Sequence, residues 1–66
     1  MKIGSILLLL RHQNSLSQEY VADKLKISQS TYSRIESDRS PPKVQLLKSL
    51  SEFYQIPISF FLANTE

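Results

Sequence analysis

Cysteine is absent from this 66-residue sequence, and glycine and histidine occur once each. Without cysteine, the chain can form neither a disulfide nor a zinc site with cysteine ligands. A chain of this length is too short for two separate cores, so we expect a single domain covering residues 1–66. Small domains that lack such cross-links depend on well-packed helices, and some also gain stability by dimerisation.

The residue types needed for catalysis are equally scarce. His12 is the only histidine, and it lies opposite the apolar side of its predicted helix with no acidic residue in register. The sequence has no glycine-rich phosphate loop, no cluster of metal ligands and no nucleophile beside a base. We therefore expect no enzymatic activity, no cofactor, no bound metal and no small-molecule substrate.

No hydrophobic run approaches the ~20 residues that a membrane-spanning helix requires. The apolar run at residues 6–10 resembles part of a secretory signal, but Arg11 and His12 end it and no small-x-small cleavage site follows. We expect a soluble protein that does not enter a membrane and that is located in the cytoplasm, associated with the nucleoid.

Apolar residues recur at helical spacing throughout the chain, and none of the clusters alternates as a strand would. The predicted helices cover about residues 2–13, 17–25, 28–37 and 43–54, with a short last helix after Pro57. Ser17 and Ser28 are suited to cap the second and third helices, and Pro41-Pro42 interrupts the chain before the fourth. The pattern predicts an all-α fold, a compact five-helix bundle.

Each predicted helix has an apolar face that we expect to be buried. The inward-facing residues are Ile3, Ile6, Leu7 and Leu10, then Val21, Ala22 and Leu25, then Tyr32 and Ile35, then Leu46, Leu47, Leu50, Phe53 and Tyr54, and finally Ile58, Phe61 and Leu62. Three further apolar residues, Leu8, Leu9 and Phe60, exceed what this core accommodates. They predict a surface for homodimerisation, through the first or the last helix, or for a protein partner.

Only Lys26 and Ile27 separate the second and third predicted helices. That is the short turn of a helix-turn-helix unit, here at about residues 17–37. Ala22 is small enough for the two helices to cross closely. The outer face of the third helix is then free to enter the major groove of DNA, which is ~12 Å wide.

These residues resemble the phage repressor and Cro family, also called the xenobiotic-response-element (XRE) family. The resemblance is carried by Leu16-Ser17-Gln18-Glu19, Val21-Ala22, Leu25, Ile27-Ser28-Gln29, Tyr32-Ser33 and Ile35-Glu36, with Leu7, Leu10 and Arg11 upstream and Pro42, Leu46, Leu47, Leu50, Ile56 and Leu62 downstream. It covers about the whole chain and implies a lambda-repressor-like domain. The implied function is a sequence-specific transcriptional regulator, a dimeric repressor that binds a short near-palindromic operator in double-stranded DNA.

The start of the third helix contains the expected base-reading residues. Gln29 can both donate to and accept from a base, most naturally adenine N6 and N7. Ser30 follows it, and the pair Gln29-Ser30 is similar to base-reading pairs of phage repressors. Ser33 and Arg34 lie one turn further on, and Arg34 could contact either guanine or a phosphate.

Phosphate contacts are expected from polar and basic residues around that helix. The candidates are Gln18, Lys26, Arg39 and Lys43. Gln18 opens the second helix, where backbone N–H groups can meet a phosphate, and the resemblance implies the same role. The formal net charge of +2 is modest, so ordinary solvated surface charge is the alternative for the three basic residues.

Two further features follow from the resemblance. Arg11 and Glu36 occupy positions that in the family form an ion pair between the first helix and the end of the reading helix. We expect the pair to position the reading helix without touching bases. Family members often have glycine where this chain has Lys26, Asp38 and Gln55, because the backbone there commonly adopts positive φ.

A protein-interaction module of the same fold is the competing hypothesis, for example an antitoxin-like protein. It would keep the helical bundle but bind a protein in place of DNA.

Overall fold

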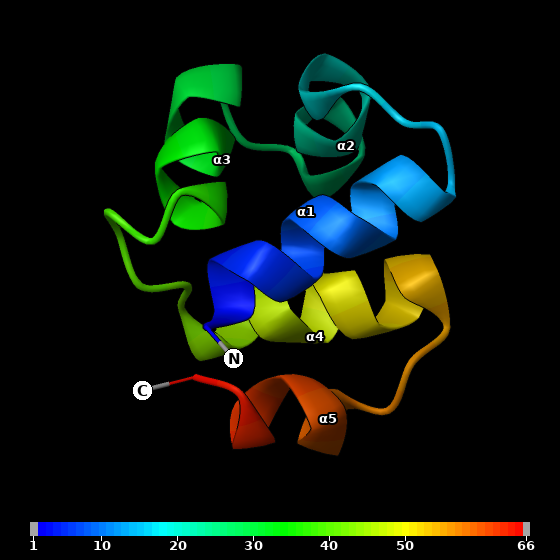
Figure 1. Ribbon diagram of the computed structural model, residues 1–66, viewed down its shortest axis with the longest axis vertical. Coiled ribbons are helices and arrows are strands. Elements are labelled where there is room, and N and C mark those ends of the chain that lie inside the picture. The colour runs from blue at the N-terminus through cyan, green and yellow to red at the C-terminus, as the bar shows by residue number, and fades with distance from the viewer. Residues whose placement is uncertain (1, 66) are drawn as a thin grey trace.

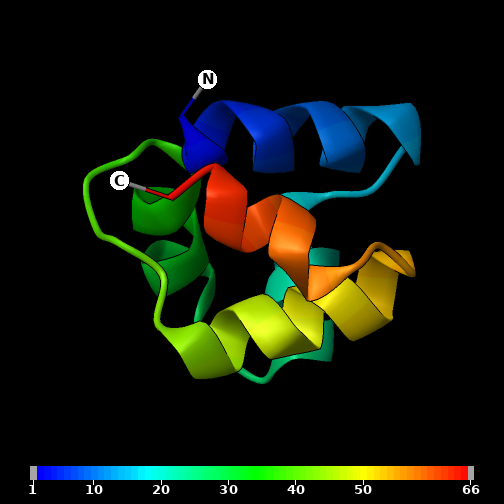
Figure 2. The same ribbon diagram turned by 90° about the horizontal axis from the view of Figure 1, so that it is seen from below.

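The computed structural model describes residues 2–65, and within that range all regular structure is helical. The helices are α1 (Ile3–Gln13), α2 (Gln18–Leu25), α3 (Gln29–Glu36), α4 (Val44–Tyr54) and α5 (Ile58–Ala63). In Figure 1, α2 and α3 lie together at one end, α1 and α4 occupy the middle, and α5 covers the opposite end. Viewed from below, the two ends of the described chain lie on the same side of the bundle (Figure 2). The predicted all-α, five-helix architecture is confirmed.

Serine side chains begin the two helices of the helix-turn-helix unit. Ser17 Oγ accepts the Tyr20 N–H at 3.0 Å, and Ser28 Oγ accepts the Thr31 N–H at 3.1 Å. Each bond satisfies one of the N–H groups that a helix start leaves without a partner. Both predicted N-caps are therefore present, and they determine where α2 and α3 begin.

A residue with positive φ follows each of the first four helices, and none of these residues is glycine. They are Ser15 (φ 55°), Lys26 (φ 61°), Asp38 (φ 63°) and Gln55 (φ 58°). In each turn the next N–H returns to the carbonyl five residues earlier, as Ile27 does to Ala22 at 3.0 Å, which is the Schellman closure. A side chain in this conformation costs roughly 1–2 kcal/mol. The three positions at which glycine is usual in the family thus adopt the conformation that favours glycine.

The core is formed by one face of each helix. The most deeply buried large side chains are Leu7, Val21, Tyr32, Leu47, Leu50 and Phe61. Ala22 is also buried, where α2 packs on α3. Leu62 was predicted to face inward, but it is 46% exposed. The short α5 turns only one side toward α4, and Phe61 occupies that side.

No helix within residues 2–65 is both long and apolar enough to span a membrane.

Candidate nucleic-acid interface

The outer face of α3 is polar and exposed. Gln29, Ser30 and Arg34 are exposed and Ser33 is half-buried, whereas Tyr32 is buried on the opposite side. Since successive helical residues are ~100° apart, Ser30 and Arg34 lie near the middle of the outer face and Gln29 and Ser33 toward one edge. The four predicted base-reading residues therefore share one side of α3.

Thr31, which the sequence reasoning did not select, is also exposed in the first turn of α3. Its hydroxyl accepts a hydrogen bond from Ser28 Oγ at 2.8 Å, and Ser30 Oγ lies 3.3 Å from the same Ser28 oxygen. Residues at the start of a recognition helix are the ones that reach base edges. Position in the first turn was thus the signal that could have identified Thr31.

The helix α3 lies at the edge of the molecule in both ribbon views, and no other helix of the described chain covers its outer side (Figures 1 and 2). On its inner side it packs against α2 and α1. Its position therefore depends on contacts made from one side only.

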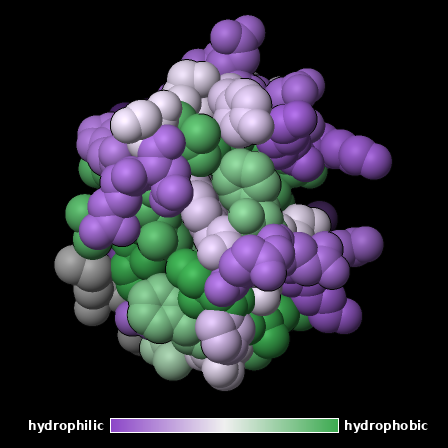
Figure 3. All heavy atoms as spheres, turned by 90° about the vertical axis from the view of Figure 1, so that its right-hand side faces the viewer, coloured by the Kyte–Doolittle hydropathy of each residue, from purple (hydrophilic) through white to green (hydrophobic). Residues whose placement is uncertain are grey.

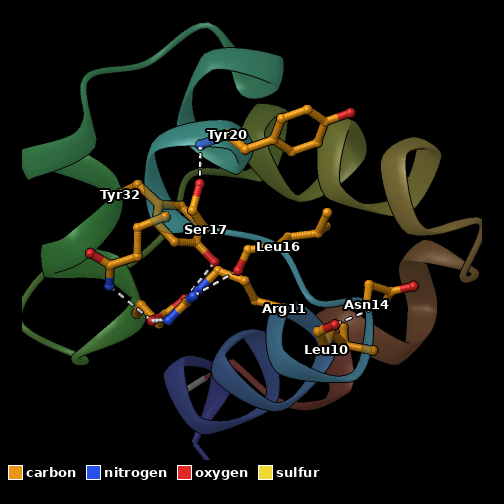
Figure 4. A network of polar contacts seen from close by, with 9 residues as sticks. Leu10, Arg11, Asn14, Leu16, Ser17, Tyr20 and Tyr32 are labelled. Atoms are coloured by element: carbon orange, nitrogen blue, oxygen red, sulfur yellow. Dashed lines mark hydrogen bonds and ion pairs between the residues drawn. The ribbon is translucent and has the colours of Figure 1, made fainter.

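The buried carboxylate of Glu36 connects α3 to α1 and α2. Arg11 binds it with two parallel hydrogen bonds, Nε to Oε2 at 2.8 Å and Nη2 to Oε1 at 2.9 Å. Gln18 Nε2 donates to Oε1 at 2.9 Å, and the Tyr32 hydroxyl donates to Oε2 at 2.7 Å. Figure 4 shows Arg11 extending from α1 toward Tyr32, with a further hydrogen bond to the Leu16 carbonyl at 2.9 Å. The structure thus brings Arg11 and Glu36 together and adds two partners that the sequence did not suggest.

These contacts perturb the ionisation of the network. Burial alone would raise the pKa of Glu36, but the hydrogen bonds from Arg11, Tyr32 and Gln18 outweigh it and hold that pKa below its ordinary value. The hydrogen bond with Glu36 raises the pKa of Arg11. Burial and the bond to Glu36 raise the pKa of Tyr32 far above its usual range. At neutral pH the network therefore contains a charged pair and a neutral tyrosine.

The predicted phosphate-binding residues surround α3. Lys26, Arg39 and Lys43 are exposed. Lys26 lies in the turn between α2 and α3, and Lys43 immediately precedes α4, whose first turn has no capping side chain within the described chain. Gln18 is half-buried, and one of its amide hydrogens is directed to Glu36. The second amide hydrogen has no protein partner among the hydrogen bonds of residues 2–65.

Groups of three or more histidine, aspartate or glutamate side chains that could hold a metal ion do not occur in the part of the chain that the structure describes.

Comparisons with known proteins agree with this geometry. The chain is 32% identical over 57 residues to the cryptic phage CTXphi transcriptional repressor RstR of Vibrio cholerae, covering 86% of this chain and 51% of that protein. It is 33% identical over 57 residues to the transcriptional activator BcrR of Enterococcus faecalis, covering 86% of this chain and 28% of that protein. The chain thus spans about half and about a quarter of the lengths of these relatives. The model of the helix-turn-helix family matches residues 7–61, and the chain accordingly belongs to the XRE-type helix-turn-helix family.

Proposed function

We propose that this protein binds double-stranded DNA through the major groove and regulates transcription from a short, near-palindromic operator, acting as a dimeric repressor. The observation that carries the proposal is the exposed polar face of α3, which is attached to the bundle through the buried Glu36 network on its other side. Relatives named as a transcriptional repressor and a transcriptional activator support a regulatory role.

The arrangement suits base recognition. The side chain of Gln29 carries both a donor and an acceptor and lies exposed at the first position of α3, which matches the paired groups of adenine in the major groove. Arg34, one turn later, has the fork of donors that suits guanine O6 and N7. We assign base reading to Gln29, Ser30, Ser33 and Arg34, with Thr31 at the flank.

Phosphate contacts would fix the register of α3 on the duplex. Gln18 can direct its second amide hydrogen to a phosphate while Glu36 holds the first. Lys43 offers a positive charge beside the first N–H groups of α4, which attract anions. Lys26 and Arg39 add charge at the two turns that flank α3.

Selection of bound sequences from a random DNA pool tests the proposal directly, because it yields the motif, its symmetry and the half-site spacing together. Gln29→Ala should then lose ~1–3 kcal/mol of binding free energy on the selected site and relax preference at one base position. Gln13→Ala is the matched control, since Gln13 is an exposed glutamine at the end of α1. Unchanged affinity and specificity for Gln29→Ala would show that α3 is not the reading helix.

A second variant separates charge from base reading. Lys43→Ala should weaken binding to all duplexes alike and reduce the slope of affinity against salt by about one ion. Lys48→Ala, which removes an exposed lysine further along α4, should have the smaller effect. A loss confined to the selected site would mean that Lys43 reads a base.

Homodimerisation through exposed apolar side chains is part of the proposal. Leu8 and Leu9 on α1 are 40% and 51% exposed, and Phe60 on α5 is 43% exposed. Figure 3 shows apolar side chains gathered mainly over the lower part of the face seen there, with hydrophilic side chains at the upper left and projecting along the right-hand edge. Dimeric repressors of this kind place two recognition helices ~34–36 Å apart, one turn of DNA. Sedimentation of Leu9→Glu and Phe60→Glu would show which helix forms the interface, and a monomeric wild type on the operator would exclude the dimer.

The same exposed apolar residues favour a second candidate, a protein-interaction module. It predicts that the wild type shifts no duplex even at low salt, where electrostatic binding is strongest, and yet binds a protein partner tightly. Retarded migration of the selected duplex by the wild type would decide for DNA binding.

A further inference from the structure

Asp38 connects the end of the reading helix to the start of α1. Its Oδ1 accepts the Gly4 N–H at 3.0 Å, across 34 positions of sequence. Within the described chain, the residue before α1 makes no side-chain cap, so Asp38 supplies from the other side of the fold the acceptor that a local cap would provide. Its negative charge also lies at the end of α1 where the helix dipole favours it.

Gly4 permits this contact because it has no side chain. A Cβ at that position would collide with the backbone carbonyl of Glu36 and lie 2.6 Å from Asp38 Oδ2. The first turn of α1 therefore lies directly against the last residue of α3 and the turn that follows it. Any larger residue at position 4 would push α1 and α3 apart.

Asp38 adopts φ 63°, where glycine would have less backbone strain. The carboxylate bond to Gly4 gives the aspartate a compensating interaction that glycine would lack. Among the hydrogen bonds of residues 2–65, no comparable long-range side-chain bond accompanies Gln55, whose amide donates to the nearby Glu52 carbonyl at 2.8 Å. The side chain of Asp38 thus bonds to a distant helix, whereas that of Gln55 bonds within its own turn.

The helix α1 consequently touches the end of α3 at two separate places. Arg11 binds Glu36, and Gly4 binds Asp38. Gly4 and Arg11 are seven residues apart, about 10 Å along the helix. The packing of α3 against α2 and α1 holds the helix in place, and two polar contacts at this separation restrain its rotation relative to α1 more than one contact would.

We propose that Gly4 and Asp38 are positioning residues that set the angle of α3 against α1, and hence the angle at which the reading face meets DNA. Only the second part of this inference, the angle at which the reading face meets DNA, rests on the proposed DNA-binding function. The angle between the helices exists without DNA and can be measured without it.

The test uses Asp38→Gly, which removes the carboxylate and keeps a residue suited to positive φ, so the turn can still form. Backbone residual dipolar couplings of the free protein would measure the direction of α3 relative to α1. Duplex titrations at one salt concentration would measure the ratio of affinities for the selected operator and a scrambled duplex. Gln55→Gly is the matched control, and Asp38→Asn, which keeps an oxygen acceptor and tolerates positive φ, is the conservative rescue.

We expect Asp38→Gly to reorient α3 and to lower the affinity ratio about tenfold, the equivalent of one weakened base contact. Gln55→Gly and Asp38→Asn should retain the wild-type angle and ratio. An unchanged angle in Asp38→Gly would overturn the proposal, as would an altered angle with an unchanged ratio or a failure of Asp38→Asn to restore both. If the wild type binds no duplex, the proposed function fails. The residual dipolar couplings alone then decide whether the Gly4–Asp38 contact orients α3 against α1.

Discussion

Replacing Glu36 by glutamine tests the buried network most directly. The glutamate side chain is 5% exposed and that of Arg11 11% exposed, and its two oxygens accept four hydrogen bonds at 2.7–2.9 Å. In Glu36→Gln one oxygen becomes an NH2 group, which donates where Arg11 also donates. Tyr32 can rotate its hydroxyl to accept, but the guanidinium N–H groups cannot. The variant therefore leaves at least one charged donor buried without a partner.

The expected loss is about 3 kcal/mol of unfolding free energy, at the lower end of the range for breaking a buried pair, because Arg11 keeps some access to water. A domain of this length has a total stability of only ~3–10 kcal/mol. A loss of that size would lower the melting temperature by about 15 °C. Urea unfolding followed by circular dichroism at pH 7 would measure it, with the exposed Glu52→Gln as a control expected to change less than ~0.5 kcal/mol.

A double-mutant cycle with Arg11→Met isolates the pair from the other partners. We expect a coupling free energy of at least ~1.5 kcal/mol between Arg11 and Glu36, since the two side chains share a bidentate contact. A coupling below ~0.5 kcal/mol, or a loss below ~1 kcal/mol in Glu36→Gln, would refute the reasoning. The ion pair would then be a geometric feature with no energetic role.

The lowered pKa of Glu36 gives the same variant a pH signature. A carboxyl group whose pKa is lower in the folded state stabilises the fold above its unfolded pKa, ordinarily 4.5, and loses this contribution as pH falls through the folded pKa. The difference between wild type and Glu36→Gln should therefore be constant from neutral pH to about 5 and shrink at lower pH. A difference that grows on acidification would contradict this assignment.

Two further variant sets test the turns and the tyrosines. Lys26→Gly and Gln55→Gly should each raise the free energy of unfolding by ~0.5–1 kcal/mol, measured as a higher urea midpoint. The reason is that relief of Cβ strain at positive φ exceeds the added unfolded-state entropy of glycine. A lower midpoint in both variants would show that the turns are unstrained. Tyr54→Phe should change stability by less than ~0.5 kcal/mol or raise it, because Tyr54 Oη is buried with no hydrogen-bond partner in the described structure. Tyr32→Phe should cost ~1.5–3 kcal/mol, since its hydroxyl donates to a carboxylate, and a larger loss for Tyr54→Phe would reverse this ranking.

Much of the fold could be predicted because its signals are local. The spacing of Ile3, Ile6 and Leu7 identifies the buried side of α1 without any knowledge of its neighbours, and Ser17 and Ser28 mark helix starts through bonds that span three residues. The inward assignment of Leu62 was wrong because periodicity cannot tell how much of a short helix its neighbours cover.

The candidate site likewise contains some features that the sequence could predict and others that only the structure shows. Gln29, Ser30, Ser33 and Arg34 share a face of α3 by helical geometry alone, so the sequence could group them, although their contact with bases stays a prediction. The network around Glu36 was predictable only for Arg11, because the resemblance implied that pair. Tyr32 had been assigned to the core as an apolar residue, and Gln18 to a phosphate, yet both donate to the same carboxylate.

By itself, the sequence determined the five helices, the helix-turn-helix unit and the polar face of α3, since each depends on residues within a few positions of one another. Only the tertiary structure decided how that face is held. The bonds from Gln18 to Glu36 and from Gly4 to Asp38 join residues 18 and 34 positions apart, and such contacts exist only once the helices have packed. Local patterns record which surfaces are buried, whereas the direction of α3 follows from where separate helices meet.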